Sequence, residues 1–173
     1  KMKNYEKIQL GVFPTPLYRL PNMSRTLGTN VWIKRDDMTG VALGGNKVRK
    51  LEYLLADAKN NGYDLVMTTG QAQSNHAMLT AACASRIGME CILVLKKRGV
   101  TARKGNQILN HLMDTDVRFI DTDSYAEIYE EMDRIGAEKG RRVYKIPCGG
   151  SNALGTLGYV DCIKEVVQSG LTF

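Results

Sequence analysis

The sequence predicts an α/β fold in which helices cover both faces of an open parallel sheet. Two observations predict it. Short β-rich runs alternate with segments of 3.6-residue apolar periodicity over more than 100 residues, and no internal repeat or low-complexity linker interrupts the alternation. Strict alternation of this kind is typical of a parallel sheet buried between helices. At 173 residues, 43% of them hydrophobic, the chain has the length of one domain or one and a half and can bury a real core.

The chain is expected to start irregularly and then to alternate strands with helices. An α/β chain that stops where its next strand begins, at Leu171-Thr172-Phe173, is expected to be truncated, or to have a terminal edge strand completed by a partner. The β-rich runs are 31–34, 64–69, 91–95, 117–120 and 143–146. The helical stripes are Val48, Leu51, Leu55 and Ala58; Met78, Leu79 and Cys83; Ile108, Leu109, Leu112 and Met113; Ile128, Met132 and Ile135 behind a capping box of Ser124 and Glu127; and a last helix over about 152–167.

Composition excludes several classes of protein. The net charge is +6, but Lys and Arg are spread along the chain, and the densest basic groups, 96–98 and 139–142, contain no aromatic residue that could stack on a base. No nucleic-acid partner is therefore expected. No apolar run approaches the roughly 20 residues that span a bilayer, and the first ten residues lack a signal-like stretch, so no membrane partner is expected either. The four cysteines form no CxxC and no metal-ligand spacing, which predicts no metal site and a reducing, cytoplasmic location.

The segment 44–52, GGNKVRKLE, is the first candidate site. Asn46 is a natural N-cap, yet the first helical turn carries Lys47, Arg49 and Lys50, although the helix dipole disfavours cations there. Lys47 and Lys50 share a helix face, and the dipole and a neighbouring cation both lower a lysine pKa, which favours the free amine of Schiff-base chemistry. The alternative is a solvated, exposed turn. A P-loop is excluded because Asn46 stands where the phosphate-binding lysine belongs.

The segment 68–76, TTGQAQSNH, follows a strand and opens a helix. Ser74 or Asn75 can cap that helix, and its first N–H groups can hold an anion such as a carboxylate. The alternatives are a plain polar turn and, for His76, a structural role. No GxGxxG fingerprint occurs. The segment 147–152, PCGGSN, follows the last strand and is expected at the same edge of the sheet.

Taken together, these motifs resemble a known family. FPTPLYRL, KRDD, GGNKVRKLE, QSNH and IPCGGSNALGTLGYV look like the pyridoxal-phosphate enzymes of the D-cysteine desulfhydrase and 1-aminocyclopropane-1-carboxylate deaminase group, within the fold-type II, tryptophan-synthase-β-like superfamily. The match runs from about Phe13 to Val166. It implies the small domain of a fold-type II enzyme plus the start of its large domain. The implied parts are an N-terminal arm and the start of the large domain with the cofactor lysine over 1–50, the small α/β domain over 51–157, and a return helix into the large domain over 158–173.

The resemblance also implies roles for individual residues. Lys47 would carry pyridoxal 5'-phosphate through its ε-amine and, with Ser74, be catalytic. Asn46, Lys50 and Asn75 would contact the cofactor. Ser74, Asn75 and His76 would receive the substrate carboxylate. The turn Gly149-Gly150-Ser151 would close the site.

The resemblance implies a lyase of small amino acids. The expected reaction converts D-cysteine to pyruvate, ammonia and hydrogen sulfide, because His76 follows Ser-Asn; the alternatives are 1-aminocyclopropane-1-carboxylate deaminase and a non-catalytic α/β module.

The sequence departs from the family pattern at Gln71, Ala72 and Met78. The family's phosphate loop would follow Phe173. The isolated chain is therefore expected to be a poor enzyme that retains cofactor weakly or not at all, and the intact parent is expected to be a homo-oligomer.

Overall fold

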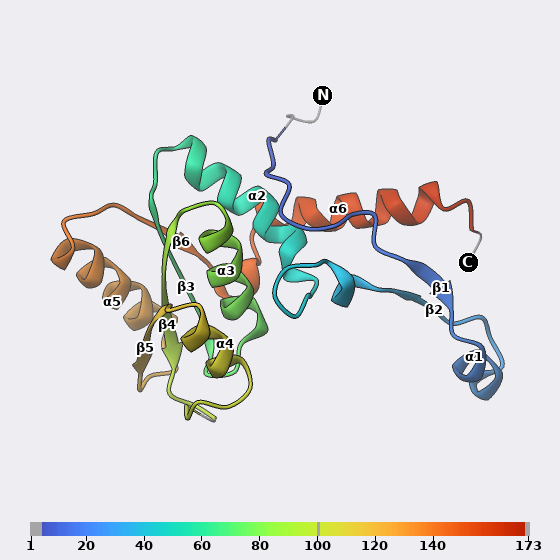
Figure 1. Ribbon diagram of the computed structural model, residues 1–173, viewed down its shortest axis with the longest axis horizontal. Helices are drawn as coiled ribbons and strands as arrows, with labels where there is room; N and C mark the ends of the chain where they lie inside the picture. The colour runs from blue at the N-terminus through green and yellow to red at the C-terminus, as the bar shows by residue number, and fades with distance from the viewer. Residues whose placement is uncertain (1–4, 100, 172–173) are drawn as a thin grey trace.

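Four parallel strands form the central sheet of the computed structural model, which describes residues 5–99 and 101–171 (Figure 1). The spatial order is β5-β4-β3-β6, and every neighbouring pair is parallel. This confirms the predicted fold class. The strands are β3 (Leu65–Gln71), β4 (Glu90–Lys96), β5 (Asp116–Ile120) and β6 (Val143–Ile146).

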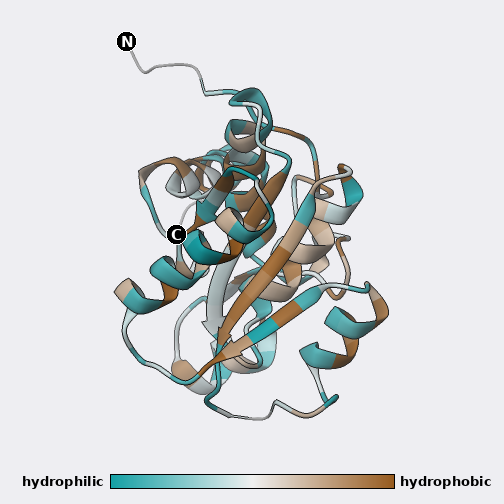
Figure 2. Ribbon diagram, turned by 90° about the vertical axis from the view of Figure 1, so that its left-hand side faces the viewer, coloured by the Kyte–Doolittle hydropathy of each residue, from teal (hydrophilic) through white to brown (hydrophobic). Residues whose placement is uncertain are grey.

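Helices cover both faces of this sheet, because its strands bury side chains on both sides. Cys91, Leu93 and Leu95 of β4 pack toward α2 (Lys47–Asn60) and α3 (Asn75–Arg86), beside which lies α4 (Asn106–Leu112). Ile92 and Val94 pack toward α5 (Tyr125–Glu138) on the opposite face. Figure 2 shows the central strands as largely hydrophobic ribbons between helices of mixed hydropathy. The core thus consists of two apolar layers, one on each face of the sheet.

The described chain is irregular from residue 5 to residue 16, as predicted, but the strand and helix that follow over 17–27 were not predicted. β2 (Trp32–Lys34) was expected as a strand, but it pairs antiparallel with β1 (Leu17–Arg19) in a separate two-stranded sheet. Between them lies α1 (Pro21–Leu27), which starts on a proline and ends at Gly28 in the left-handed conformation. Proline at the first helical position and glycine just beyond the last are ordinary helix boundary signals. A short 3-10 turn, η1 (Asp36–Met38), follows.

The capping box predicted at the start of α5 forms only in part. Ser124 Oγ accepts a hydrogen bond from the Glu127 backbone N–H at 3.4 Å, as expected. The reciprocal bond is absent among the described residues, because Thr122 Oγ1 accepts from the Ser124 N–H at 3.0 Å instead. A nearer hydroxyl has replaced the Glu127 carboxylate as the acceptor.

The last helix, α6 (Ala153–Gln168), follows the 3-10 turn η2 (Cys148–Gly150) and packs across the first turns of α2. Asn152 caps it by accepting from the Gly155 N–H at 2.8 Å. Two glycines permit close backbone approaches of α6, Gly155 to the turn η2 and Gly158 to α2. A Cβ at Gly155 would lie 2.2 Å from the Gly150 carbonyl oxygen, and a Cβ at Gly158 would lie 2.3 Å from the carbonyl oxygen of Arg49. The backbones of α6 and α2 are therefore in contact where α2 begins.

This contact gives a first prediction. Gly158→Ala is expected to lower the free energy of unfolding by about 1–3 kcal/mol, because the added methyl meets rigid backbone and must push α6 away from α2. Urea unfolding followed by circular dichroism measures the change. Thr156→Ala, an exposed position of the same helix, is the control and should stay within about 0.5 kcal/mol of the wild type. A Gly158→Ala variant as stable as this control would contradict the packing argument.

The predicted domain boundaries stay predictions, and both fall inside helices, one within α2 and one within α6. The strand expected at 171–173 lies outside the described residues except for Leu171. Across 5–99 and 101–171, no helix is both long and apolar enough to cross a membrane. All four cysteines carry free thiols: Cys83, Cys91 and Cys162 are buried and Cys148 is partly exposed.

Candidate active site

Three segments far apart in the sequence meet at the carboxyl edge of the sheet, where ligands bind in open α/β folds. They are the start of α2 at Lys47, the turn between β3 and α3 at Ser74, and the turn after β6 at Gly149. A Cβ built on Gly149 would lie 3.7 Å from Lys47 Cε, and one built on Gly45 would lie 2.6 Å from Asn75 Nδ2. The structure therefore brings together the three segments that the sequence singled out.

Lys47 is partly buried, and its amine donates a hydrogen bond to Asn46 Oδ1 at 3.2 Å. Asn46 does not cap α2, so the prediction of a natural N-cap is wrong. Its backbone is in the right-handed helical conformation (φ −62°, ψ −16°), whereas a capping residue is extended. The Asn46 side chain instead donates from Nδ2 to the hydroxyl of Tyr159 on α6.

Lys50 contacts the turn that follows β6. Its amine donates to the Gly149 carbonyl at 3.1 Å and to Ser151 Oγ at 2.9 Å. Burial, with a further contribution from the positive charge of Lys47, holds the pKa of Lys50 below its usual value. Through these two hydrogen bonds, Lys50 connects the start of α2 to the 149–151 turn.

Ser74 caps α3, as one of the two sequence alternatives predicted. Its Oγ accepts from the Ala77 N–H at 3.1 Å, while its backbone is extended. Gly70 makes room for this side chain, because a Cβ there would lie 2.5 Å from Ser74 Oγ. Asn75 follows with an exposed side chain beside Gly45. The N–H groups of Asn75 and His76 have no intrahelical acceptor, since the first turn of a helix has no preceding carbonyls.

His76 turns its ring into the protein and is only 4% exposed. Its Nε2 lies 2.9 Å from Thr68 Oγ1, which itself donates to the carbonyl of Ile146 on β6. Because Thr68 uses its one hydrogen in that bond, the network assigns the proton of a neutral His76 to Nε2. Any contact with a substrate carboxylate is left to the backbone N–H of His76. The predicted substrate role of this residue stays a prediction.

Burial, helped by the positive charges of Lys47 and Lys50, lowers the pKa of His76 to about 3, and only the carbonyl of Pro147 opposes the shift. The unfolded chain, with an ordinary histidine pKa near 6.5, then binds more protons than the folded chain below that pH. This contribution to stability is present above pH 6.5 and is lost as the pH falls toward 3. The free energy of unfolding is expected to drop by about 2 kcal/mol between pH 7 and pH 5.

Urea unfolding at pH 7, 6 and 5 measures this slope. Because carboxylates titrate mainly below this range, His76 should dominate within it. His76→Gln is expected to flatten the dependence, and His111→Gln, at the exposed second histidine, should leave it as in the wild type. Equal slopes for all three proteins would contradict the assignment of a buried, neutral His76.

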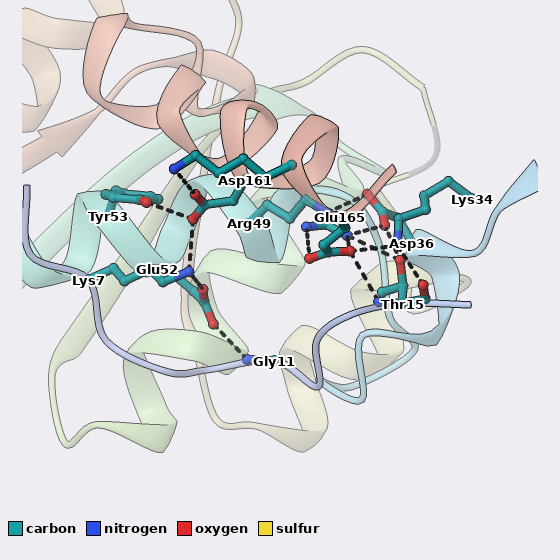
Figure 3. Close-up of polar contacts among 11 residues, drawn as sticks. Lys7, Gly11, Thr15, Lys34, Asp36, Arg49, Glu52, Tyr53, Asp161 and Glu165 are labelled. Carbon is teal, nitrogen blue, oxygen red and sulfur yellow. Dashed lines mark hydrogen bonds and ion pairs between the residues drawn. The ribbon is translucent and has the colours of Figure 1, made fainter. Parts of the chain in front are cut away.

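Arg49, the third cation of the first turn, points away from Lys47. Its guanidinium is 2% exposed and forms paired hydrogen bonds with Asp36 at 2.8 and 2.9 Å and with Glu165 of α6 at 2.8 and 2.9 Å. Figure 3 shows this cluster together with Thr15 and Lys34. The cluster joins the N-terminal arm, α2 and α6. Arg49 is therefore a structural cation behind the candidate site.

Sequence analysis missed two contributors to the site. Tyr159 contacts Asn46 and places its ring 5.7 Å from the Lys50 amine. The start of α4 holds the turn before Ser74: the Asn106 side chain donates to the Gln73 carbonyl at 3.0 Å, and Gln107 donates to the carbonyl of Ala72. Tyr159 lies in the GTLGYV motif already quoted, but no pattern indicated that its hydroxyl reaches residue 46. Neither of the α4 residues had a sequence signal.

Comparisons with known proteins agree with this geometry. The family model described as pyridoxal-phosphate dependent enzyme matches residues 8–171. A D-cysteine desulfhydrase of Salmonella typhi is 44% identical over 174 residues, covering 96% of this chain and 53% of that protein. A Pyrococcus horikoshii protein, provisionally named 1-aminocyclopropane-1-carboxylate deaminase, is 43% identical over 176 residues, covering 99% and 54%.

A solved structure, described as that of an ACC deaminase homologue, is also similar. It matches with a TM-score of 0.88 and 43% identity over 94% of this chain and 50% of that one. The chain thus spans about half the length of the relatives it matches.

Proposed function

Because the chain belongs to the pyridoxal-phosphate dependent enzymes, we propose that it supplies the Lys47 site of a lyase acting on a small amino acid. One observation carries the proposal. The primary amine of Lys47 is held by Asn46 beside the glycine turn after β6, and the start of α3 reaches the same place. A reactive amine, a glycine turn that leaves space beside it and the N–H donors at the start of α3 therefore lie close together at one edge of the sheet.

The residues present fit an aldehyde-bearing aromatic cofactor. Gly149 keeps the space beside Lys47 open, since a Cβ there would lie 3.7 Å from Lys47 Cε, and Gly45 does the same beside the Asn75 carboxamide. Asn75 offers an exposed carboxamide at the same place. Lys47 would hold the cofactor through its amine, and Asn46, Lys50 and Asn75 are the side chains placed to contact it. When bound, pyridoxal phosphate withdraws electrons from the substrate Cα.

The substrate carboxylate is proposed to lie at the start of α3. The N–H groups of Asn75 and His76 and the positive end of the helix dipole favour an anion there. Ser74 Oγ accepts from Ala77, and within 5–99 and 101–171 no residue accepts its hydrogen, which leaves that hydrogen for a substrate atom. Lys47 Nζ is the amine placed to move a proton at the substrate Cα.

D-cysteine is the substrate we propose, with pyruvate, ammonia and hydrogen sulfide as products. The proposal draws on the order Ser74-Asn75-His76 and on the 44% identity to a protein named D-cysteine desulfhydrase. The second candidate is 1-aminocyclopropane-1-carboxylate, because a relative of nearly equal identity carries the deaminase name. We further propose a homo-oligomer in a reducing compartment, where the four thiols stay free.

Trapping tests the cofactor site. The full-length protein is mixed with pyridoxal phosphate and reduced with borohydride, which fixes the cofactor to the amine that holds it. Peptide mapping should find the label on Lys47. A label on a peptide carrying Lys34, Lys50 or Lys59, with Lys47 unmodified, would overturn the assignment.

A panel of amino acids tests the substrate. D-cysteine, L-cysteine, cysteate and 1-aminocyclopropane-1-carboxylate are incubated with the cofactor-loaded full-length protein, and sulfide, ammonia and the 2-oxo acid are measured. Sulfide from D-cysteine supports the desulfhydrase proposal. Turnover of 1-aminocyclopropane-1-carboxylate alone would replace it with the deaminase.

A further inference from the structure

We propose that Tyr159 of α6 is a positioning residue for Lys47, acting through the side chain of Asn46. The inference rests on the proposed function of Lys47. It adds a residue that lies 113 positions away from the segment it serves, on a different helix. The phenol hydroxyl of Tyr159 holds one end of the Asn46 carboxamide, and the other end holds the Lys47 amine.

Two hydrogen bonds form this chain. Asn46 Nδ2 donates to the Tyr159 hydroxyl oxygen, and Lys47 Nζ donates to Asn46 Oδ1 at 3.2 Å. A carboxamide has its donors on nitrogen and its acceptor on oxygen, at opposite ends of one planar group. Fixing the nitrogen on Tyr159 therefore fixes the direction in which the oxygen faces. That direction is toward Lys47.

The position of Asn46 in the helix explains why its side chain is available. An asparagine before the first helical residue ordinarily accepts a hydrogen bond from the first turn of its own helix. The helical backbone of Asn46 prevents this, and its side chain makes no capping bond. A local helix-start contact has thus been exchanged for a long-range one. Breaking a local preference in this way is typical of a site residue.

The packing of α6 on α2 delivers the Tyr159 hydroxyl. Gly158, the residue before it, touches the backbone of Arg49 closely enough to exclude a methyl group. The partly buried ring of Tyr159 also lies 5.7 Å from the Lys50 amine, within the range of a cation–π contact. Helix contact and ring contact together leave the hydroxyl little freedom. The Tyr159 hydroxyl is therefore a well-ordered acceptor for the Asn46 side chain.

The Lys47 side chain has four rotatable bonds, and ordering it costs conformational entropy. An amine reacts faster with an aldehyde when it is already held in the reactive direction. With Tyr159 in place, Asn46 Oδ1 holds the amine beside Gly149. Without the hydroxyl, the carboxamide can rotate, and its oxygen no longer faces the amine in a fixed direction.

Tyr159→Phe removes one oxygen atom and keeps the ring beside Lys50. Tyr53→Phe is the matched control, because the Tyr53 hydroxyl also bridges α2 and α6, bonding to Asp161 Oδ2 at 2.7 Å, but without contacting Lys47. The first measurement uses the cofactor-free chain and ¹³C relaxation of the lysine Cε groups, which reports picosecond to nanosecond mobility. Lys47 should be more ordered than the exposed Lys59 in the wild type and in Tyr53→Phe. It should become more mobile in Tyr159→Phe and in the second variant, Asn46→Ala.

The second measurement is the rate at which borohydride traps pyridoxal phosphate on Lys47. Tyr159→Phe should slow trapping by about three- to tenfold, the effect of one neutral hydrogen bond, while Tyr53→Phe stays at the wild-type rate. Unchanged Lys47 mobility in Tyr159→Phe would overturn the inference. So would increased mobility with an unchanged trapping rate. If mobility rises but even the wild type is never labelled at Lys47, the proposed function is wrong while the support of Lys47 by Tyr159 stands.

Discussion

Arg49→Met is expected to lose about 3–5 kcal/mol of the free energy of unfolding, a large share of the stability of a domain of this size. The change removes a buried guanidinium and leaves the carboxylates of Asp36 and Glu165, both largely buried, without their main partner. Lys34 still pairs with Glu165, and Thr15 Oγ1 still donates to Asp36 at 2.8 Å. Neither replaces the four charged hydrogen bonds that Arg49 supplies.

Urea unfolding followed by circular dichroism measures this loss. Arg134→Met is the control, because Arg134 pairs with Glu131 and Glu138 on the exposed face of α5 and is 56% exposed. An exposed pair contributes little, so this variant should lose less than about 1 kcal/mol. Adding Asp36→Asn and Glu165→Gln to Arg49→Met should recover part of the loss, since unpaired buried charges are then removed. If Arg49→Met costs no more than Arg134→Met, the cluster does not hold α2 and α6 together.

Arg49 also shows where sequence reasoning stops. Three cations at the start of α2 break the helix-dipole preference, and the sequence offers no compensation nearby. For Arg49 the compensation is three-dimensional: its two carboxylates come from 13 residues before it and 116 residues after it. The sequence correctly identified the unusual cluster of cations at the start of α2. Only the fold distinguishes the structural Arg49 from the two lysines of the candidate site.

Periodicity predicted the central sheet well, because each of its strands and covering helices has an apolar pattern of its own. The five runs expected as strands are all strands, and the stripe at Val48, Leu51, Leu55 and Ala58 lies in the core between α2 and the sheet. What periodicity does not encode is pairing. β2 joins β1 in a separate sheet because its partner is a three-residue strand with no pattern long enough to detect.

The candidate site was predicted in outline for a general reason. Its segments follow strands or open helices, and the carboxyl ends of parallel strands share one edge. Side-chain directions were not predicted. Asn46 was expected to cap its helix and instead bridges Lys47 and Tyr159. The buried ring of His76 agrees with the structural role that the sequence left open as an alternative, but the sequence did not indicate Thr68 as its partner. Such directions depend on neighbours that only the folded chain provides.

Lys47→Ala is expected to have the largest functional effect. In the proposed function the cofactor is held through the primary amine of Lys47, which alanine lacks, so the labelled Lys47 peptide of the trapping experiment should disappear. Lys47→Arg should fail in the same way, because a guanidinium stays protonated and cannot attack an aldehyde, although it keeps the positive charge. Lys59→Arg, at an exposed lysine near the end of α2, is the control and should be labelled at Lys47 like the wild type.

Turnover should fall more steeply than cofactor content. If Lys47 Nζ moves the proton at the substrate Cα, its removal costs roughly two to four orders of magnitude in rate, as for other general acid–base groups. Cofactor that still associates without a covalent link would not restore this step. The release of sulfide from D-cysteine by cofactor-saturated Lys47→Ala measures the effect. A variant that keeps more than about a tenth of the wild-type rate would show that a different group moves the proton. Lys50, whose lowered pKa and position across the same turn make it the nearest alternative amine, would then be the next residue to replace.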